Sequence, residues 1–429
     1  MKASFYNLLF EHNGKRYVYN TLTTALASID EKTSTILQKS NVAHIPAEVK
    51  NSLHTQGFIV EDDLDEVAAY ECYYNEAQYS GFRDELRIVF VPTYNCNLRC
   101  VYCFEDCNIH TSIKGDDIQQ IVAFAKKQLS SNNRYKKISL VLFGGEPLLC
   151  ADQCITLCNS LSLVATEYGI EMSTKISTNA LLINQKIIEE LFIPTNMRIQ
   201  ITMDGNRAFH DKRRIYRSGE GTYDKILESI TLLNKYGIKD AIDLRINVDK
   251  NNLNSLEEVI RDIYNKVGYI YIGLLRAVGN NLERVSDCIS DNDYILKYRP
   301  MLEPLFNKYG KQLHYGDFGK KHACALNSGN SYIIDCNLDV YKCDNLIGQP
   351  QYAVGKIIEG ELRRKPMYYK QRTWSPFKFE KCRKCNLLPA CTASCAYLCL
   401  LKNGSMDTPL CAFTEEEFIG KIKQFLDRR

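Results

Sequence analysis

Apolar runs alternate with amphipathic stretches through the middle of the chain. Such strand–helix alternation predicts right-handed βαβ units, and therefore a parallel sheet that is either open or curled into a barrel. In both arrangements ligands collect at the carboxyl ends of the strands. The strand-like runs are LRIVFVP at 86–92, ISLVLF at 138–143, EMSTKIS at 171–177, MRIQITM at 197–203, AIDLRINV at 241–248 and YIYIGLL at 269–275.

The first 80 or so residues follow a different pattern. Two short strand-like runs flank Asn13-Gly14, and Asn-Gly between such runs is a strong hairpin signal. We interpret this stretch as a small separate α+β module, with an N-terminal extension of the main domain as the alternative. Helical patterns follow the hairpin at 30–39, 46–55 and 63–78.

Composition narrows the class of protein. The chain has 429 residues, of which 45% are hydrophobic and 24% charged, as in a globular protein. Its net charge is +3, from 54 basic and 51 acidic residues, which gives no support for a nucleic-acid partner. The N-terminus lacks the apolar core of a signal peptide, and no apolar run reaches the roughly 18–20 residues of a membrane span. We therefore expect a cytoplasmic protein that binds neither nucleic acid nor membrane.

The cysteine content changes this picture, because the chain contains 18 cysteines. Thiols stay reduced in the cytosol, where clustered cysteines bind metal or do chemistry. Cys96, Cys100 and Cys103 form a C-x3-C-x2-C loop after the first strand of the alternating region. Thiolate ligands select iron–sulfur clusters, zinc or Cu(I). A structural zinc site usually has four ligands, so three leave one position open for a substrate. The alternative is a zinc loop with a fourth ligand elsewhere.

This loop, with Tyr102 before its last cysteine, resembles the signature of the radical S-adenosylmethionine (SAM) enzymes. The resemblance implies a partial (β/α)6 barrel and a [4Fe–4S] cluster on the three cysteines, with the amine and carboxylate of SAM on the remaining iron. It also implies that the reduced cluster cleaves SAM to methionine and a 5′-deoxyadenosyl radical. That radical takes a hydrogen from an unactivated carbon, and the protein positions the reactants.

Polar motifs at the ends of the next three strands match the same family. By resemblance, a Gly-Gly-Glu-Pro turn binds the SAM amino group, and a Ser-Thr-Asn sequence lies at the ribose. Glycines without side chains would also let the backbone approach a ligand closely. Thr202 replaces the family's serine at the SAM carboxylate, and Arg213, Arg214 or Arg217 pairs with that group; we favour Arg214. The predicted cofactor-binding residues are Tyr102, Gly144, Gly145, Glu146, Pro147, Ser177, Asn179, Thr202, Asp204 and Arg214.

A second cysteine set lies near the C-terminus. Four thiols spaced by two, five and three residues could bind zinc or an iron–sulfur cluster. The spacing resembles the SPASM extension of radical SAM enzymes, which carries two auxiliary [4Fe–4S] clusters. One departure is Leu338, where the family usually has glycine. The resemblance implies Cys324, Cys343 and Cys395 as ligands of the first auxiliary cluster, and Cys382, Cys385, Cys391 and Cys411 as ligands of the second.

The fourth ligand of the first auxiliary cluster is left open by the pattern. Cys336 is the nearest candidate; otherwise the position is free and a substrate thiolate could occupy it. The other cysteines are predicted to pack as small thiols. In total the sequence predicts three [4Fe–4S] clusters and SAM as cofactors.

The predicted fold is an α/β protein of three domains. A winged-helix-like peptide (leader) recognition module spans 1–85, the radical SAM barrel spans 86–310, and the SPASM domain spans 311–429. Enzymes with this extension mostly modify peptides or proteins. Our first hypothesis is a peptide maturase that forms a thioether or related crosslink. The N-terminal module would capture the leader of a precursor peptide by β-augmentation, and flavodoxin or ferredoxin would donate electrons.

Two other functions compete with this hypothesis. Cys343-Asp344 resembles the anaerobic sulfatase-maturing enzymes, which make formylglycine and in which Asp344 would act as general base. The structural alternative for Asp344 is a solvated loop carboxylate. A non-catalytic iron–sulfur electron-transfer protein is a function of another class, but it would leave the SAM motifs unexplained.

Overall fold

The computed structural model describes residues 1–40, 42, 45–80, 84–105, 110–131, 134–275, 286–289, 294–310, 324–391 and 395–427. The chain divides into two compact units. The barrel unit consists of Gly81–His314 and Ala325–Thr373. The terminal unit consists of Met1–Ser80, Tyr315–Cys324 and Trp374–Arg429.

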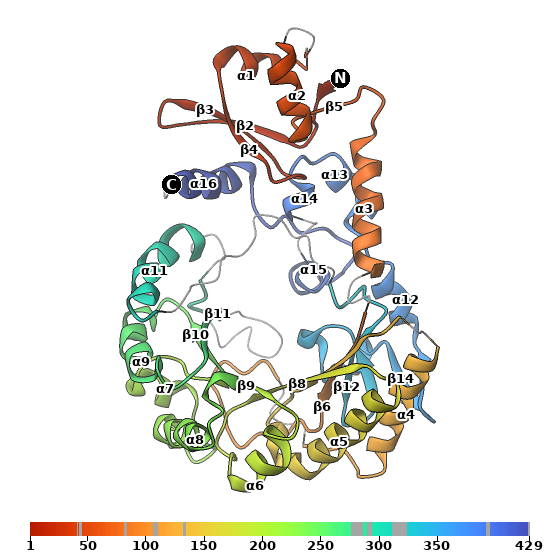
Figure 1. The fold of residues 1–429 in the computed structure, drawn as a ribbon, viewed down its shortest axis with the longest axis vertical. Helices are drawn as coiled ribbons and strands as arrows, with labels where there is room; N and C mark the ends of the chain where they lie inside the picture. The colour runs from red at the N-terminus through yellow and green to blue at the C-terminus, as the bar shows by residue number, and fades with distance from the viewer. Residues whose placement is uncertain are drawn as a thin grey trace. The chain divides into compact units, whose positions relative to one another are not determined.

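Six parallel strands form the centre of the barrel unit, and they lie in the sheet in the order of the chain (Figure 1). This confirms the α/β prediction and all six strand-like runs. The sheet stays open, since β11 lies at its edge and pairs only with β10 among the described strands. The strands are β6 (Glu85–Val91), β7 (Lys137–Leu142), β8 (Glu171–Thr178), β9 (Arg198–Thr202), β10 (Ile242–Val248) and β11 (Tyr269–Leu274).

Helices cover the outer side of this curved sheet (Figure 1). Successive side chains of a strand point to opposite faces, and the apolar half is fully buried, for example Leu140 and Leu142 of β7. The alternate positions are polar on several strands, as Ser177 and Gln200 show. Helices of this unit are α4 (Asp117–Ser130), α5 (Ala151–Glu167), α6 (Gln185–Ile187), α7 (Arg207–Arg213), α8 (Tyr223–Lys235), α9 (Leu256–Ile263), α11 (Arg299–Lys308) and α12 (Pro366–Arg372).

One helical stretch, Pro147–Glu167, is long and apolar enough by composition to cross a membrane. The sequence shows no continuous apolar run of that length, because polar residues interrupt it. The stretch packs on β7, β8 and α4, as a core helix does. A core helix can meet the same criteria of length and apolar composition. Its buried side consists of Cys154, Leu157, Cys158, Leu161, Val164 and Ala165.

The sheet continues beyond β6 with strands that we had predicted to belong to a separate C-terminal domain. Strand β12 (Ser331–Asp335) pairs with β6 in parallel, so this part of the chain joins the barrel unit. Leu338, in the turn after β12, has a φ of 63°. That left-handed conformation favours glycine, which explains why the family usually has glycine at this position. The antiparallel strands β13 (Asp339–Tyr341), β14 (Gly355–Ile358) and β15 (Glu361–Arg364) follow.

The terminal unit begins with the predicted hairpin. Its two central residues, Asn13 and Gly14, have φ values of 48° and 72°, as a two-residue type I′ turn requires. The expected helices are present, and β1 (Lys2–Ala3) pairs with β5 (Ile59–Val60). The hairpin sheet contains β2 (Asn7–His12), β3 (Lys15–Asn20) and β4 (Leu26–Ile29), and it is followed by α1 (Glu31–Gln38), α2 (Ala47–Thr55) and α3 (Glu66–Ser80).

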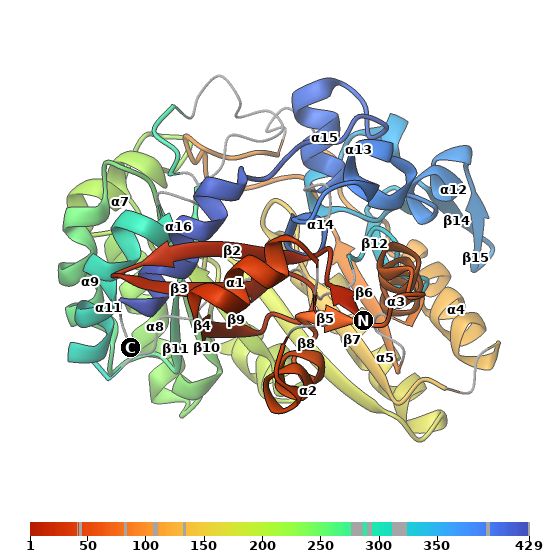
Figure 2. The same ribbon diagram turned by 90° about the horizontal axis from the view of Figure 1, so that it is seen from above.

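This hairpin sheet shares a hydrophobic core with the C-terminal part of the chain. Helix α16 (Glu415–Leu426) lies beside β2 (Figure 2). The N-terminal stretch is therefore not a compact unit of its own, in contrast to the separate module that we inferred from the sequence. The shared core consists of Leu8, Phe10, Tyr19, Leu387, Ala390, Phe418 and Ile422. The short helices of this region are α13 (Glu380–Arg383), α14 (Leu388–Cys391) and α15 (Ala396–Asn403).

Candidate active site

The three-cysteine loop follows β6 directly in the barrel unit. The pKa of Cys96 and that of Cys103 are raised to about 12, mainly by burial, with a charge on Cys100 contributing to both increases. Three desolvated thiols whose negative charges repel one another need a positive centre if they are to ionise. The donor set therefore fits an iron–sulfur cluster.

The geometry of the thiols also bears on the zinc alternative. Across the described ranges, no three His, Cys, Asp or Glu side chains lie close enough together to hold a single metal ion. A four-iron cluster is larger than one ion and can reach thiolates that lie farther apart. We therefore favour the cluster over a zinc loop.

The Gly-Gly-Glu-Pro turn packs against the segment that leads into the cysteine loop. A Cβ atom on Gly144 would lie 2.7 Å from the carbonyl oxygen of Thr93, and one on Gly145 would lie 2.2 Å from that of Asn95. The Gly145 and Glu146 N–H groups donate to the same two carbonyls at 3.1 and 2.8 Å. The glycines thus allow two backbone segments to meet; a close approach to SAM stays a prediction.

Glu146 connects this turn to the end of β8. Its carboxylate is fully buried and accepts hydrogen bonds from the Thr178 hydroxyl at 2.7 Å and from the N–H groups of Asn179 and Leu148 at 2.8 and 3.0 Å. Burial raises the pKa of Glu146, and these three hydrogen bonds oppose the increase. Asn179 in turn donates from Nδ2 to Asn97 Oδ1 at 2.7 Å, within the cysteine loop. Glu146 therefore positions residues that contact the loop.

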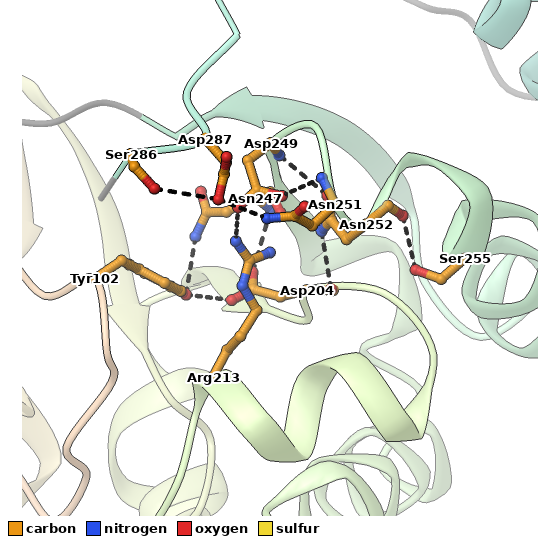
Figure 3. A network of polar contacts seen from close by, with 10 residues as sticks. All are labelled: Tyr102, Asp204, Arg213, Asn247, Asp249, Asn251, Asn252, Ser255, Ser286 and Asp287. Atoms are coloured by element: carbon orange, nitrogen blue, oxygen red, sulfur yellow. Dashed lines mark hydrogen bonds and ion pairs between the residues drawn. The ribbon is translucent and has the colours of Figure 1, made fainter. Parts of the chain in front are cut away.

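Tyr102 links the cysteine loop to the ends of β9 and β10 (Figure 3). Its hydroxyl donates to Asp204, and it accepts from Arg214 Nη1 at 2.8 Å and from Asn247 Nδ2 at 3.2 Å. Burial raises the pKa of Tyr102 well above its ordinary value, and the charge on Arg214 opposes this. The tyrosine therefore stays a neutral donor that anchors the loop. The polar residues after β10, including Asp249 and Asn252, were not predicted, although they follow a strand end like the motifs that were.

Two neighbouring arginines are available for an anionic ligand here. Arg213 pairs with Asp249 (Figure 3) and Arg214 bonds to Tyr102, and each side chain is only 9% exposed. Arg213 Nη1 and Arg214 Nε are buried without a hydrogen-bond partner in the described part of the chain. A carboxylate such as that of SAM would satisfy both nitrogens. Arg217, by contrast, is exposed.

The remaining predicted SAM contacts lie at strand ends nearby. Thr202 ends β9 and stands in register with Arg245 of the next strand. Ser177 Oγ accepts a hydrogen bond from Gln200 Nε2 at 3.0 Å. Pro147 begins the short helical turn before α5. Their contacts with SAM stay predictions.

His210 on α7 takes part in the same hydrogen-bond network. Its Nδ1 accepts the N–H of Asp204 at 3.3 Å, and its Nε2 lies 2.9 Å from the Thr222 hydroxyl, which donates to the Arg214 carbonyl at 2.7 Å. Burial lowers the pKa of His210 to about 3, and the Arg214 charge contributes. The imidazole is therefore neutral and carries its proton on Nε2. The sequence motif contained this histidine, but its spacing alone indicated no role.

The buried imidazole predicts a pH-dependent stability. Above about pH 6.5 His210 is neutral in both the folded and unfolded states. Below about pH 6.5 the His210 imidazole binds a proton in the unfolded chain, whereas in the folded chain it stays neutral down to about pH 3. The free energy of unfolding should therefore fall by about 1.4 kcal/mol from this group between about pH 7.5 and 5.5. Urea unfolding of wild type and His210→Gln at both pH values measures this. Equal pH dependence in the two proteins would contradict it.

The two predicted auxiliary sites are distributed over both units. Cys382, Cys385, Cys391 and Cys411 all lie in the terminal unit. Burial raises the pKa of Cys382 to about 11, and charges on the other three cysteines contribute to the increase. The Ala412 N–H also lies 3.5 Å from Cys391 Sγ. Their role as the ligands of one auxiliary cluster stays a prediction.

The other predicted ligands are divided between the two units. Cys324 and Cys395 belong to the terminal unit, whereas Cys336 and Cys343 belong to the barrel unit. Burial raises the pKa of Cys336 to about 12, with Asp335 adding to the increase. The ligand roles of these four cysteines stay predictions. Cys107 lies outside the described residues.

Asp344 begins a short turn directly after Cys343. Its side chain is exposed, yet the surrounding chain desolvates it enough to raise its pKa, while the charge on Arg87 opposes the increase. Arg87 lies on β6, the strand that leads into the cysteine loop. A role for Asp344 as a base stays a prediction.

Known proteins resemble this chain. A family model described as the radical SAM superfamily matches residues 90–263. The cysteine-type anaerobic sulfatase-maturating enzyme of Clostridium novyi (strain NT) is 25% identical over 328 residues, which cover 70% of this chain and 85% of that protein. The solved structure of anSMEcpe with bound AdoMet and a peptide has a TM-score of 0.62 at 16% identity and covers 80% of this chain and 98% of that one. Streptococcus suis SuiB bound to precursor peptide SuiA has a TM-score of 0.58 at 17% identity, with 95% and 98% coverage.

The matched region runs from β6 to α9. It therefore contains the three-cysteine loop, the Gly-Gly-Glu-Pro turn and the Tyr102 network described above. A non-catalytic electron carrier would not need the Gly-Gly-Glu-Pro turn or the Tyr102 network, and the relatives are enzymes. Residues 90–263 form a radical SAM domain, and the chain that carries this domain is an enzyme.

Proposed function

We propose that this enzyme is a radical SAM/SPASM peptide maturase that forms a thioether or related crosslink in a precursor peptide. The observation that carries the proposal is the folded stretch of sheet and helices before the radical SAM domain, in residues 1–80. The likeness to SuiB extends over 95% of this chain, against 80% for anSMEcpe. The N-terminal stretch is thus included in the likeness to a structure whose title names a precursor peptide.

The barrel residues have defined tasks in this proposal. Cys96, Cys100 and Cys103 hold the first of three [4Fe–4S] clusters, which when reduced supplies the electron that cleaves bound SAM. Arg213 and Arg214 hold the SAM carboxylate through their unpartnered nitrogens. The Tyr102 network keeps the loop at a constant position, so that little reorganisation is needed during the reaction.

The hairpin sheet is the proposed site for the leader of the precursor. Its strand order is β2-β3-β4, so β4 pairs on one side only among the described strands. An edge strand presents unpaired N–H and C=O groups, and a peptide that adds to it gains main-chain hydrogen bonds. On this basis we propose that the hairpin sheet belongs to a winged-helix-like recognition module. We also propose that the enzyme carries SPASM clusters and has a cytoplasmic location.

The alternative function is an anaerobic sulfatase-maturing enzyme that makes formylglycine. Two observations favour it: the 25% identity with such an enzyme, and the position of Asp344 directly after a predicted cluster cysteine. In that function Asp344 would accept the proton released when the substrate residue is oxidised.

Mass spectrometry of the product distinguishes these functions. The enzyme, reconstituted anaerobically with iron and sulfide, is supplied with SAM, dithionite and either the precursor peptide encoded beside its gene or a peptide from a sulfatase. A thioether crosslink removes two hydrogens and keeps the sulfur. Formylglycine formed from cysteine also removes two hydrogens but replaces sulfur by oxygen. We expect the first product from the precursor; the second product, from the sulfatase peptide alone, would overturn the proposal.

A further inference from the structure

We infer that the outward side of the cysteine loop is the docking surface for an acidic protein that carries single electrons. We name Arg99, Val101, Lys212 and Arg217 the loop patch. The inference goes beyond the proposed function, because it concerns how electrons enter the enzyme and holds for any peptide or protein substrate.

The patch is built by two antiparallel segments. Residues 98–101 of the cysteine loop run beside residues 213–216, which begin at the last residue of α7, and Lys212 and Arg217 flank this second segment. The N–H groups of Arg99 and Val101 donate to carbonyls of the second segment at 2.8 and 3.0 Å. These hydrogen bonds keep the loop extended and bring the end of α7 next to it.

An extended segment sends alternate side chains to opposite sides. Leu98 is buried and Cys100 is half-buried, so both point into the barrel unit. Arg99 and Val101 are exposed, and Val101 keeps 45% of its surface accessible. The outward face therefore lies directly behind a cluster ligand, separated from it by the backbone alone.

The charges on this face are not neutralised. Arg99, Lys212 and Arg217 are exposed, and within the described part of the chain none of them forms an ion pair or a side-chain hydrogen bond. Some other exposed cations of the same unit are paired, as Lys126 is with Glu167 at 2.7 Å. The adjoining turn contributes one exposed acid, Glu220.

The half-buried Asp211 on α7 offsets part of this charge, but within the described part of the chain it forms no ion pair with these cations. Its carboxylate already accepts the N–H groups of Thr222 and Tyr223 at 2.7 and 2.8 Å. The face thus presents an exposed apolar side chain surrounded by excess positive charge. Interfaces combine such an apolar centre with a charged rim, and the opposite charge on a partner speeds encounter.

An acidic one-electron carrier fits this face because the cluster behind it must be reduced before each SAM cleavage. The transfer is balanced as it stands. One electron leaves the reduced carrier, which is oxidised by one, and one electron enters the [4Fe–4S] cluster, which is reduced by one. No bond is made or broken, and no proton moves in this step.

Charge reversal on the patch tests the inference. The probe is flavodoxin, a small acidic flavin protein, and the enzyme is used with its clusters reconstituted. We expect Arg99→Glu/Lys212→Glu to weaken binding of oxidised flavodoxin, and to slow reduction of the cluster by reduced flavodoxin, at least tenfold at about 0.1 M salt. Raising the salt to about 1 M should remove the difference, because the charges are then screened. Reduction by dithionite, which needs no docking surface, should stay unchanged.

A matched control carries the same change in charge elsewhere. Lys136 and Lys239 are exposed and precede β7 and β10, at the amino-end edge of the sheet, away from the loop. Lys136→Glu/Lys239→Glu should bind and accept electrons from flavodoxin as the wild type does. If both double variants are impaired equally, or if the patch variant binds flavodoxin with wild-type affinity, the inference is overturned.

One further variant controls for the possibility that the double substitution distorts the cysteine loop. Should the double patch variant also lose reduction by dithionite, Lys212→Glu alone decides, since Lys212 lies on α7 and outside the cysteine loop. A lower affinity for flavodoxin with normal dithionite reduction supports the inference, and unchanged affinity refutes it. Neither result depends on the identity of the peptide substrate, so a failed maturase proposal would be recognised separately.

Discussion

Replacing Cys96 with alanine is expected to abolish SAM cleavage and to remove one cluster's iron from the reconstituted enzyme. Cys96 Sγ lies 3.4 Å from the Leu98 N–H nitrogen and 3.8 Å from Asn179 Nδ2, so protein donors already orient the thiol. Loss of such an outer partner of a metal ligand typically costs 10- to 100-fold, and loss of the ligand costs more. We therefore expect at least about a hundredfold less 5′-deoxyadenosine, measured with dithionite and SAM.

Cys72→Ala is the matched control for this change. Cys72 is exposed on α3, and its thiol lies 3.8 Å from Glu76. The same atoms are removed, but no predicted ligand is affected, so iron content and SAM cleavage should stay at wild-type values. If Cys96→Ala retains wild-type iron and cleaves SAM, the three-cysteine cluster is wrong.

Gly145→Ala is expected to lower SAM cleavage about a hundredfold without unfolding the protein. The new Cβ would lie 2.2 Å from the Asn95 carbonyl oxygen and 2.7 Å from that of Tyr94. Both atoms belong to the backbone, so no side-chain rotation relieves the contact, and the segment leading into Cys96 must move. A displacement of about 1 Å at a reacting centre can cost about 100-fold in rate. The rate of 5′-deoxyadenosine formation measures the effect, and circular dichroism checks the fold.

Gly115→Ala provides the comparison. A Cβ there meets nothing within 4 Å, and the backbone needs no left-handed conformation. Its rate should equal that of the wild type. A Gly145→Ala enzyme as fast as Gly115→Ala would show that the close approach of the two backbone segments does not control the geometry of the cluster loop.

Features encoded by neighbouring residues were predictable from the sequence. The Asn13-Gly14 turn follows from a local backbone preference, since its positive φ values favour these two residues. The six parallel strands follow from apolar runs that end in polar motifs. Cys96, Cys100 and Cys103 are close in the chain and therefore necessarily close in space. Short-range order of this kind needs no knowledge of what packs against it.

The support of the site could not be predicted in the same way. Asn247 in the last part of β10 and Asp249 just after it are ordinary polar residues, and only the parallel register places them beside Tyr102 and Arg213. The glycines were expected to make room for a ligand, yet the atoms they make room for belong to residues 93–95. Spacing in the sequence does not encode which distant backbone segment will lie opposite.

The sequence by itself determined the class of fold, the cysteine loop and the six strand-forming runs, because periodicity and spacing are local. Only the tertiary structure decided which surfaces share a core. The apolar positions Leu8 and Phe10 predict burial but not their partners, which turn out to be Phe418 and Ile422 at the other end of the chain. Hydrophobic burial depends on area and not on identity, so a pattern can name the buried face of an element without naming what covers it.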